Sequence, residues 1–288
     1  MALRDVVTLL RPQQWVKNVF VFAPGFFAFR LGEGEVFAAS LGGALAFGLV
    51  ASSIYVLNDA LDVEADRRHP EKCLRPLAAG TVSMREAAGA AAGCALAGFA
   101  LGGFLGERVL ELLLFYAILN GAYSLRLKHV PLVDVFCVAT GFLLRIFVGG
   151  AATGIALSSW IIVMTFLLAL FIALAKRRDD VLHAAAGRDV RAATAGYNLP
   201  LVDMALGVLA SVTLVAYLMY TMAPEVGERF GGRPVYLTFP WVLLGILRYF
   251  QRTLVFQDSG SPTRIILSDR FLQGVLALWV LSFFFLGR

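Results

Sequence analysis

Long apolar stretches recur along this chain, and short polar connections separate them. Hydrophobic residues make up 59% of the 288 residues and charged residues only 16%, whereas a soluble domain carries about a quarter charged residues. Each stretch has roughly 17–25 residues, which is long enough to cross the hydrocarbon core of a bilayer as a helix. The pattern predicts an all-α integral membrane protein with nine transmembrane helices, forming a single domain over residues 1–288. The predicted spans are 15–31, 36–60, 86–104, 108–125, 132–153, 158–175, 203–222, 235–252 and 270–287.

The Lys and Arg residues are unevenly distributed over the connections. With the N-terminus in the cytoplasm, 19 of the 25 fall on the cytoplasmic side, 5 fall on the other side, and Arg145 lies inside a span. Cytoplasmic loops of membrane proteins carry this excess. We therefore expect a cytoplasmic N-terminus, an external C-terminus and an odd number of spans. The short N-terminal segment of mixed charge predicts no signal peptide, and the net charge of +5 reflects topology rather than a nucleic-acid partner.

An acidic sequence follows the second predicted span and reads Asn58-Asp59-Ala60-Leu61-Asp62-Val63-Glu64-Ala65-Asp66. On a continuous helix of 3.6 residues per turn, Asp59, Asp62 and Asp66 share one face. Asn58 lies at the edge of that face, and Glu64 points away. Like charges at these spacings repel one another, so we expect a cation among the three carboxylates.

Magnesium suits an all-oxygen site and often bridges to substrate phosphates. The alternative is a solvated helix end whose charges are balanced by Arg67 and Arg68. Carboxylates at the end of a membrane helix favour the functional interpretation. We therefore predict that Asp59, Asp62 and Asp66 are the catalytic, metal-binding residues.

Basic residues occupy the same cytoplasmic connections. After the sixth span, Lys176, Asp179 and Asp180 share a helical face, with Arg177 beside it. Positive-inside topology accounts for any single cation here, but it does not account for acids at the same loops. Arg145 has two open interpretations: pairing with Asp134 or a helix-end carbonyl, or contact with a phosphate.

The chain resembles the UbiA superfamily of membrane prenyltransferases along its whole length, with Asn58 to Asp66 matching the first family motif. Within that superfamily it is most similar to the polyprenyl-phosphate phosphoribosyltransferases. The sequences that carry this closer resemblance are Arg11-Pro12-x-Gln14-Trp15-Val16-Lys17-Asn18, Asp62-Val63-Glu64-Ala65-Asp66-Arg67-x-His69-Pro70 continuing to Arg75-Pro76, Tyr123-Ser124 with Leu127-Lys128, Gly141-Phe142 with Arg145, and Lys176-Arg177.

The resemblance implies a UbiA-type bundle in the bacterial cytoplasmic membrane, with its active site facing the cytoplasm. It implies transfer of 5-phosphoribosyl from phosphoribosyl pyrophosphate to a polyprenyl phosphate such as decaprenyl phosphate, for cell-wall arabinan or a related polyprenyl-phosphosugar. Mg²⁺ is the implied cofactor. The implied substrate-binding residues are Lys17, Asn58, Lys72, Arg75, Tyr123, Lys128, Arg145, Lys176, Arg177 and Asp180.

Two other functions remain open from the sequence. A UbiA-type aromatic prenyltransferase would use a prenyl diphosphate, but such enzymes carry a YxxxK pattern and a DxxxD-type second motif. Here Tyr123 and Lys128 are one residue further apart, and Lys176-Arg177-x-x-Asp180 replaces the second motif. A cation-coupled transporter would place charges near the bilayer midplane in paired halves, and this chain places its acids at helix ends.

Overall fold

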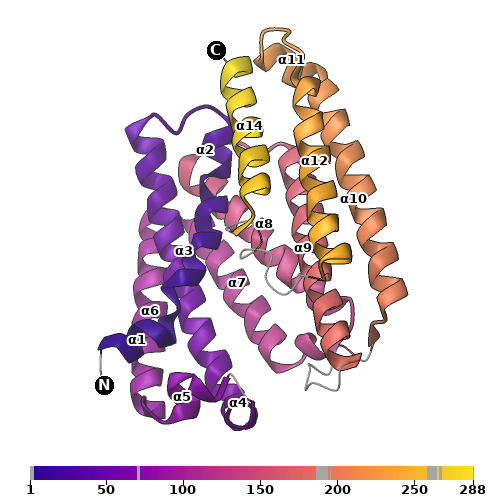
Figure 1. Ribbon diagram of the computed structural model, residues 1–288. Helices are drawn as coiled ribbons and strands as arrows, with labels where there is room; N and C mark the ends of the chain where they lie inside the picture. The colour runs from indigo at the N-terminus through magenta and orange to yellow at the C-terminus, as the bar shows by residue number, and fades with distance from the viewer. Residues whose placement is uncertain are drawn as a thin grey trace. The chain divides into compact units, whose positions relative to one another are not determined.

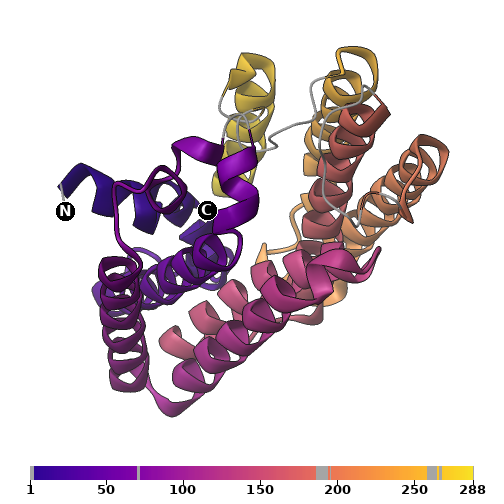
Figure 2. The ribbon, with the colours of Figure 1, turned by 90° about the horizontal axis from the view of Figure 1, so that it is seen from below.

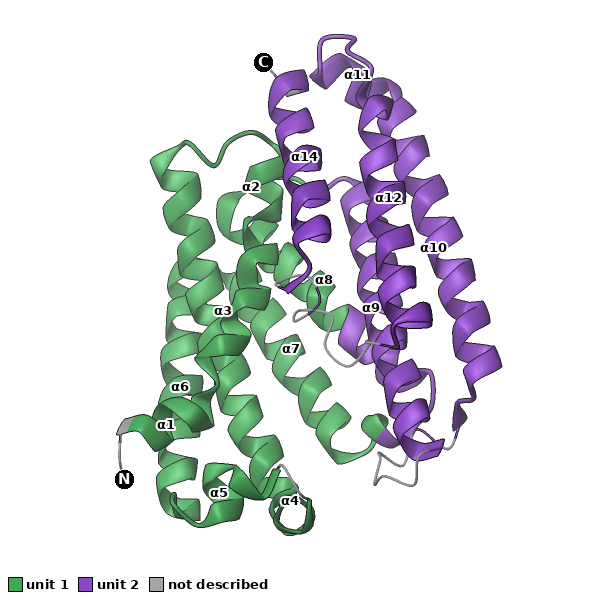
Figure 3. Cartoon of the chain, in the orientation of Figure 1, with its two compact units in different colours: residues 1–128, 140–157 green, residues 129–139, 158–288 purple. Residues whose placement is uncertain are grey.

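The regular structure of the described chain is helical. The computed structural model describes residues 3–69, 72–185, 194, 196–257, 265 and 268–287 (Figure 1). Pro70 of the motif, and Arg188, Arg191, Arg264 and Arg288 of the charge pattern, lie outside the described residues. The chain divides into two compact units, residues 1–128 with 140–157 and residues 129–139 with 158–288 (Figure 3). The expected single domain stays a prediction.

Unit 1 is built around one long helix, α3 (Gly34–Leu61), which packs against α6 and α7. Its core holds Phe47, Leu113, Tyr116 and Val148, all buried. The short helix α1 runs across the end of unit 1 rather than along α3 (Figures 1 and 2). The other elements of unit 1 are α1 (Leu3–Leu10), η1 (Pro12–Phe22), α2 (Ala23–Phe27), α4 (Val63–Arg68), η2 (Lys72–Leu74), α5 (Pro76–Ala79), α6 (Met84–Leu105) and α7 (Glu107–Leu125).

Unit 2 is formed by a set of longer helices and short connecting turns, with a buried cluster that includes Tyr217, Tyr220 and Phe283. Its elements are α9 (Ser159–Ala185), α10 (Leu199–Met222), α11 (Pro224–Arg229), η5 (Val235–Thr238), α12 (Phe239–Phe250), η6 (Gln251–Val255) and α14 (Arg270–Gly287). The helix α8 (Val133–Thr153) and the turn η3 (Leu127–His129) each contribute residues to both units.

The segment η1 is a 3₁₀ helix of 11 residues, although such helices rarely exceed 3–4 residues. It packs against α3, and glycine permits the close approach. A Cβ atom at Gly48 of α3 would lie 2.8 Å from the indole of Trp15, and one at Gly149 of α8 would lie 2.1 Å from the carbonyl oxygen of Val21. Both positions therefore exclude larger residues.

Within the part of the chain that the structure describes, six helices are long and apolar enough to cross a membrane. They are α3, α6, α7, α8, α9 and α10, and they correspond to the second to seventh predicted spans. The first predicted span is helical as η1 followed by α2, the eighth as η5, α12 and the π-helical η6, and the ninth as the shorter apolar helix α14. The multi-pass helical architecture is confirmed, while nine crossings and the direction of the termini stay predictions.

Candidate active site

The acidic sequence lies where α3 ends and α4 begins, at one end of unit 1. The structure breaks the expected continuous helix at Asp62, whose backbone φ of −97° and ψ of 5° are not helical. The backbone hydrogen bonds continue on both sides, from the Asp62 nitrogen to Asn58 and from the Asp66 nitrogen to Asp62. The prediction of one uninterrupted helix was therefore wrong: Asp62 separates α3 from α4.

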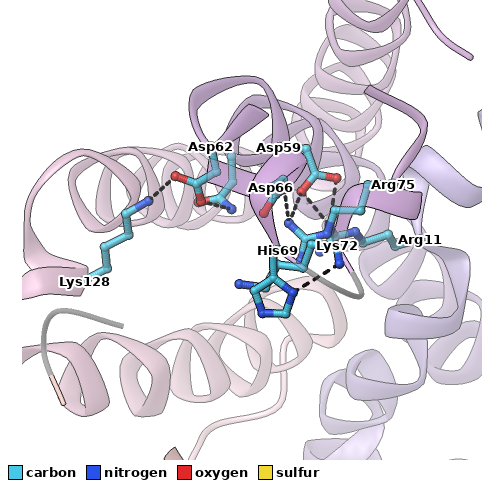
Figure 4. A network of polar contacts seen from close by, with 9 residues as sticks. Arg11, Asp59, Asp62, Asp66, His69, Lys72, Arg75 and Lys128 are labelled. Carbon is cyan, nitrogen blue, oxygen red and sulfur yellow. Dashed lines mark hydrogen bonds and ion pairs between the residues drawn. The ribbon is translucent and has the colours of Figure 1, made fainter. Parts of the chain in front are cut away.

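Two arginines hold Asp59 and Asp66 (Figure 4). The Nη2 atom of Arg11 donates to both carboxylate oxygens of Asp59, at 2.5 and 2.7 Å. The Nη1 atom of Arg75 donates to Asp59 at 3.0 Å and to Asp66 at 2.6 Å. Asp59 is 2% exposed and Asp66 4% exposed. Two buried carboxylates are thus neutralised by guanidinium groups, as buried charges require.

Asp62 faces a different cation. Its Oδ1 atom accepts a hydrogen bond from the Nζ of Lys128 at 2.7 Å, and its Oδ2 atom accepts one from the Nδ2 of Asn58 at 3.1 Å (Figure 4). Glu64 points away, as expected, and pairs with Arg67 on the exposed side of α4. Arg75 therefore bridges Asp59 and Asp66, whereas Asp62 forms its ion pair with Lys128.

The donor set suits magnesium in its chemistry, because it consists of carboxylate and amide oxygens. Among the described residues, however, no three Asp, Glu, His or Cys side chains are grouped so that they could hold a metal ion. The reason is visible in the contacts above, since the oxygens of Asp59, Asp62 and Asp66 accept hydrogen bonds from three basic side chains.

The other expected substrate-binding residues of unit 1 lie on nearby elements or along η1. Lys72 begins η2, and its backbone nitrogen donates to the Nδ1 of His69 at 3.3 Å (Figure 4). Tyr123 is half-buried in the last turn of α7, just before the turn that carries Lys128. Lys17 is half-buried on η1.

Arg145 is buried within α8, with 4% of its surface exposed. Its Nη1 atom donates to the carbonyl of Gly141 at 2.7 Å, and its Nε atom donates to the side chain of Asn18 at 3.1 Å. Aromatic rings surround the guanidinium, with the Phe47 ring centroid 4.4 Å away. Within the part of the chain that the structure describes, no ion pair joins Arg145 to a carboxylate. Pairing with Asp134 is therefore wrong. Arg145 contacts a carbonyl within its own helix rather than one at a helix end, and its contact with a phosphate stays a prediction.

Unit 2 holds a second buried polar cluster, centred on Asp134 at the start of α8. Asp134 is fully buried, and one of its oxygens accepts a hydrogen bond from the Nε of Arg177 at 2.6 Å. Its other oxygen accepts one from the hydroxyl of Tyr197 at 2.6 Å. Arg177 also pairs with Asp180. Arg177 is thus 3% exposed and engaged by two carboxylates, whereas Lys176 is exposed.

Tyr197 fixes the connection before α10. Its hydroxyl accepts a hydrogen bond from the backbone nitrogen of Leu132 at 2.7 Å while it donates to Asp134. Burial, together with its hydrogen bond to Asp134, raises the pKa of Tyr197 well above its usual value. A Cβ atom at Gly196 would lie 2.2 Å from Pro131, so this connection packs tightly against the start of α8.

Three residues of these clusters were missed as site residues by the sequence argument. Arg11 carried part of the resemblance but was not assigned to the site, and a basic residue just before the first span could have suggested it. Asp134 could have been found as a carboxylate inside an apolar stretch. No signal in the sequence marks Tyr197.

Comparisons with known proteins place the chain in a family. The UbiA prenyltransferase family model matches residues 19–275. The decaprenyl-phosphate phosphoribosyltransferase of Corynebacterium glutamicum is 33% identical over 285 residues, covering 96% of this chain and 84% of that protein. The protein of the same name from Mycobacterium tuberculosis is 32% identical, covering 96% and 91%.

The fold is also that of solved relatives. The structure of a UbiA homologue from Archaeoglobus fulgidus bound to DMAPP and Mg²⁺ matches with a TM-score of 0.73 and 21% identity, covering 98% of this chain and 99% of that one. The chain belongs to the UbiA prenyltransferase family. It is a helical membrane enzyme of the transferase class, and its relatives at 31–33% identity are decaprenyl-phosphate phosphoribosyltransferases.

Proposed function

We propose that this enzyme transfers 5-phosphoribosyl from phosphoribosyl pyrophosphate to a polyprenyl phosphate, and that decaprenyl phosphate is such an acceptor. In this reaction the bond between the anomeric carbon and the pyrophosphate oxygen breaks, and the bonding pair leaves with pyrophosphate. A phosphate oxygen of the lipid forms the new bond to the anomeric carbon. The product is a polyprenyl phosphoribose, which serves arabinan or related polyprenyl-phosphosugar synthesis.

The acidic cluster is the proposed position of the leaving group. Asp59, Asp62 and Asp66 would hold Mg²⁺, with Asn58 assisting, as the carboxylate and amide oxygens suit this ion. A bound Mg²⁺ supplies positive charge that stabilises the departing pyrophosphate. That a UbiA homologue is solved with Mg²⁺ supports the assignment.

The basic side chains are proposed to bind the two anionic substrates. Lys17, Lys72, Arg75 and Lys128 in unit 1, with Tyr123 as a neutral partner, would orient phosphates and stabilise the charge that develops as the anomeric bond breaks. In unit 2, Lys176, Arg177 and Asp180 stand in the place of the family's DxxxD-type second motif. The acceptor is already an anionic phosphate oxygen, so the reaction needs no strong general base.

The proposed setting is the bacterial cytoplasmic membrane, with nine spans and the site facing the cytoplasm. Phosphoribosyl pyrophosphate is a soluble, highly charged molecule, and the excess of Lys and Arg at the connections predicts the cytoplasmic side for this end of the bundle. The lipid tail would lie against the apolar, membrane-facing helices.

The observation that carries the proposal is the pairing of three carboxylates with three cations at one end of unit 1, in a chain that matches phosphoribosyltransferases over 96% of its length. The test uses the purified full chain in detergent. Pyrophosphate release should require phosphoribosyl pyrophosphate, decaprenyl phosphate and Mg²⁺ together. If the protein instead consumes a prenyl diphosphate with an aromatic acid, the aromatic prenyltransferase alternative replaces this proposal. Gradient-driven uptake by reconstituted vesicles would favour a transporter.

A further inference from the structure

Basic side chains already neutralise the acidic cluster. Asp59, Asp62 and Asp66 carry three negative charges, and Arg11, Arg75 and Lys128 bring three positive charges into direct contact with them. The cluster is therefore neutral without any bound ion. Buried carboxylates need such counter-charges, and Asp59 and Asp66 have them in Arg11 and Arg75.

Arginine and a metal ion compete for the same carboxylate oxygens, because the guanidinium group occupies their lone pairs and repels another cation. The Nη1 atom of Arg75 lies 3.0 Å from an oxygen of Asp59 and 2.6 Å from one of Asp66 (Figure 4). Asp62 pairs separately with Lys128, at 2.7 Å. A metal that binds all three carboxylates thus has to compete with Arg75 and Lys128 at these oxygens.

The three cations are placed so that they can withdraw. Asp59 and Asp66 are buried on helices, but the side chains of Arg11, Arg75 and Lys128 are 22%, 28% and 17% exposed. None of the three lies within a long helix. Arg11 lies at the junction of α1 and η1, Arg75 immediately before α5, and Lys128 in the turn η3. Each of the three side chains thus comes from a cap or a short turn, whereas Asp59 lies in the last turn of the long helix α3.

We propose that Arg11, Arg75 and Lys128 are internal counter-ions that occupy the carboxylates until the donor arrives and then transfer to its phosphates. The inference rests on the proposed function, because it takes the metal and the phosphorylated donor from there. Metal alone has to compete with cations already in place. Donor phosphates attract those cations and free the oxygens, so metal and donor each favour the binding of the other, and such coupling is reciprocal.

The test measures metal and donor binding separately, without turnover. Mn²⁺ binding to the purified full chain in detergent is followed by electron paramagnetic resonance with no donor present. Binding of radiolabelled phosphoribosyl pyrophosphate is followed by equilibrium dialysis with EDTA present. The variant is Arg75→Gln, which keeps a hydrogen-bond donor but removes the charge.

Arg75→Gln should bind Mn²⁺ about tenfold more tightly than the wild type, because an opposite charge within about 4–6 Å of a carboxylate shifts its affinity for protons by 1–3 units and acts similarly on a cation. The same variant should bind the donor at least about tenfold more weakly, because one phosphate contact is lost. Arg75→Lys keeps the charge and should show neither change in full. Arg67→Gln is the matched control. Arg67 pairs with the exposed Glu64, both on α4, so this variant should change neither kind of binding.

The opposite signs of the two changes distinguish the explanations. A structural role for Arg75 would weaken both kinds of binding, and a bystander would change neither, so either result overturns the inference. If Arg75→Gln does not fold, Lys128→Gln tests the same idea at Asp62 and should also tighten Mn²⁺ binding. A wild-type protein that binds neither Mn²⁺ nor the donor when both are present together would instead overturn the proposed function itself.

Discussion

The Nε atom of Arg145 donates a hydrogen bond to the side-chain oxygen of Asn18, and the amide nitrogen of Asn18 donates to the carbonyl of Ala44. One amide thus joins α8, η1 and α3 within unit 1. Two further contacts along η1 repeat the attachment to α3. The indole of Trp15 donates to Ser52 at 3.0 Å, and Arg11 pairs with Asp59. These contacts fix the segment that carries Lys17.

Replacement of Asn18 by alanine should destabilise the protein by about 1–3 kcal/mol, because a buried carbonyl and the Arg145 guanidinium each lose a hydrogen-bond partner. Thermal unfolding in detergent measures the change. Asn120→Ala is the control. In the described structure the side-chain amide of Asn120 donates to a carbonyl of its own helix, that of Tyr116, so its loss should cost less. Equal losses in the two variants would show that the Asn18 bridge has no special role.

Arg145→Met should also destabilise the protein, and its effect should not add to that of Asn18→Ala. Residues that share one hydrogen bond give coupled changes in a double-mutant cycle, typically about 0.5–3 kcal/mol. The cycle is measured by thermal or denaturant unfolding of both single variants and the double variant. If Arg145→Met loses activity at wild-type stability, Arg145 contacts a phosphate instead.

Gly149→Ala should destabilise unit 1 by more than about 2 kcal/mol, because the added methyl group would lie 2.1 Å from the Val21 carbonyl and would push η1 away from α8. Gly93→Ala is the matched change. Gly93 lies within α6 and has nothing within 4 Å of an added Cβ, so alanine there should be neutral or stabilising by up to about 1 kcal/mol. The melting temperatures of the two variants measure the difference, and similar values would contradict the close packing of η1 against α8.

Asp62→Asn and Asp66→Asn should each lower turnover by at least about a hundredfold while the protein still folds, because each removes a charge from the proposed pyrophosphate site. Pyrophosphate release measures turnover, and circular dichroism with size-exclusion chromatography checks the fold. Glu64→Gln should change turnover little, since Glu64 pairs with Arg67 on the exposed side of α4. Near-normal rates in both Asp variants would remove these residues from the site.

Arg177→Gln should destabilise the protein strongly, by about 3–5 kcal/mol, because it leaves the fully buried Asp134 without its cation. Tyr197→Phe should cost about 1–3 kcal/mol, since Asp134 and the Leu132 nitrogen both lose a partner. Unfolding midpoints in urea provide the measurement. A stable Arg177→Gln protein that fails to bind substrate would instead assign Arg177 to a phosphate.

The helical spans could be predicted from the sequence because lipid selects long apolar runs, and six of them are single long helices. The lengths of the apolar runs could not show which type of helix each segment forms. Gln251–Val255 is π-helical and Pro12–Phe22 is 3₁₀, and the length of a hydrophobic run does not distinguish these windings from an α-helix.

The acidic site was predictable in its residues but not in its partners. Helical periodicity placed Asp59, Asp62 and Asp66 on one face and Glu64 on the other. It could not reveal the break at Asp62, because a non-helical residue followed at once by another helix leaves the sequence pattern intact. Nor could it pair Arg11 with Asp59, since the two are 48 residues apart in the chain and only the packing of η1 on α3 brings them together.

The 3₁₀ winding of η1 has a consequence for length. A 3₁₀ helix rises about 2.0 Å per residue, so its 11 residues extend about 22 Å, where an α-helix would extend about 16 Å. The five residues of α2 add about 7 Å. The sixteen residues from Pro12 to Phe27 therefore reach about 30 Å, the thickness of a hydrocarbon core. The predicted first crossing, which would be too short as a plain α-helix, would gain the length it needs from this tighter winding.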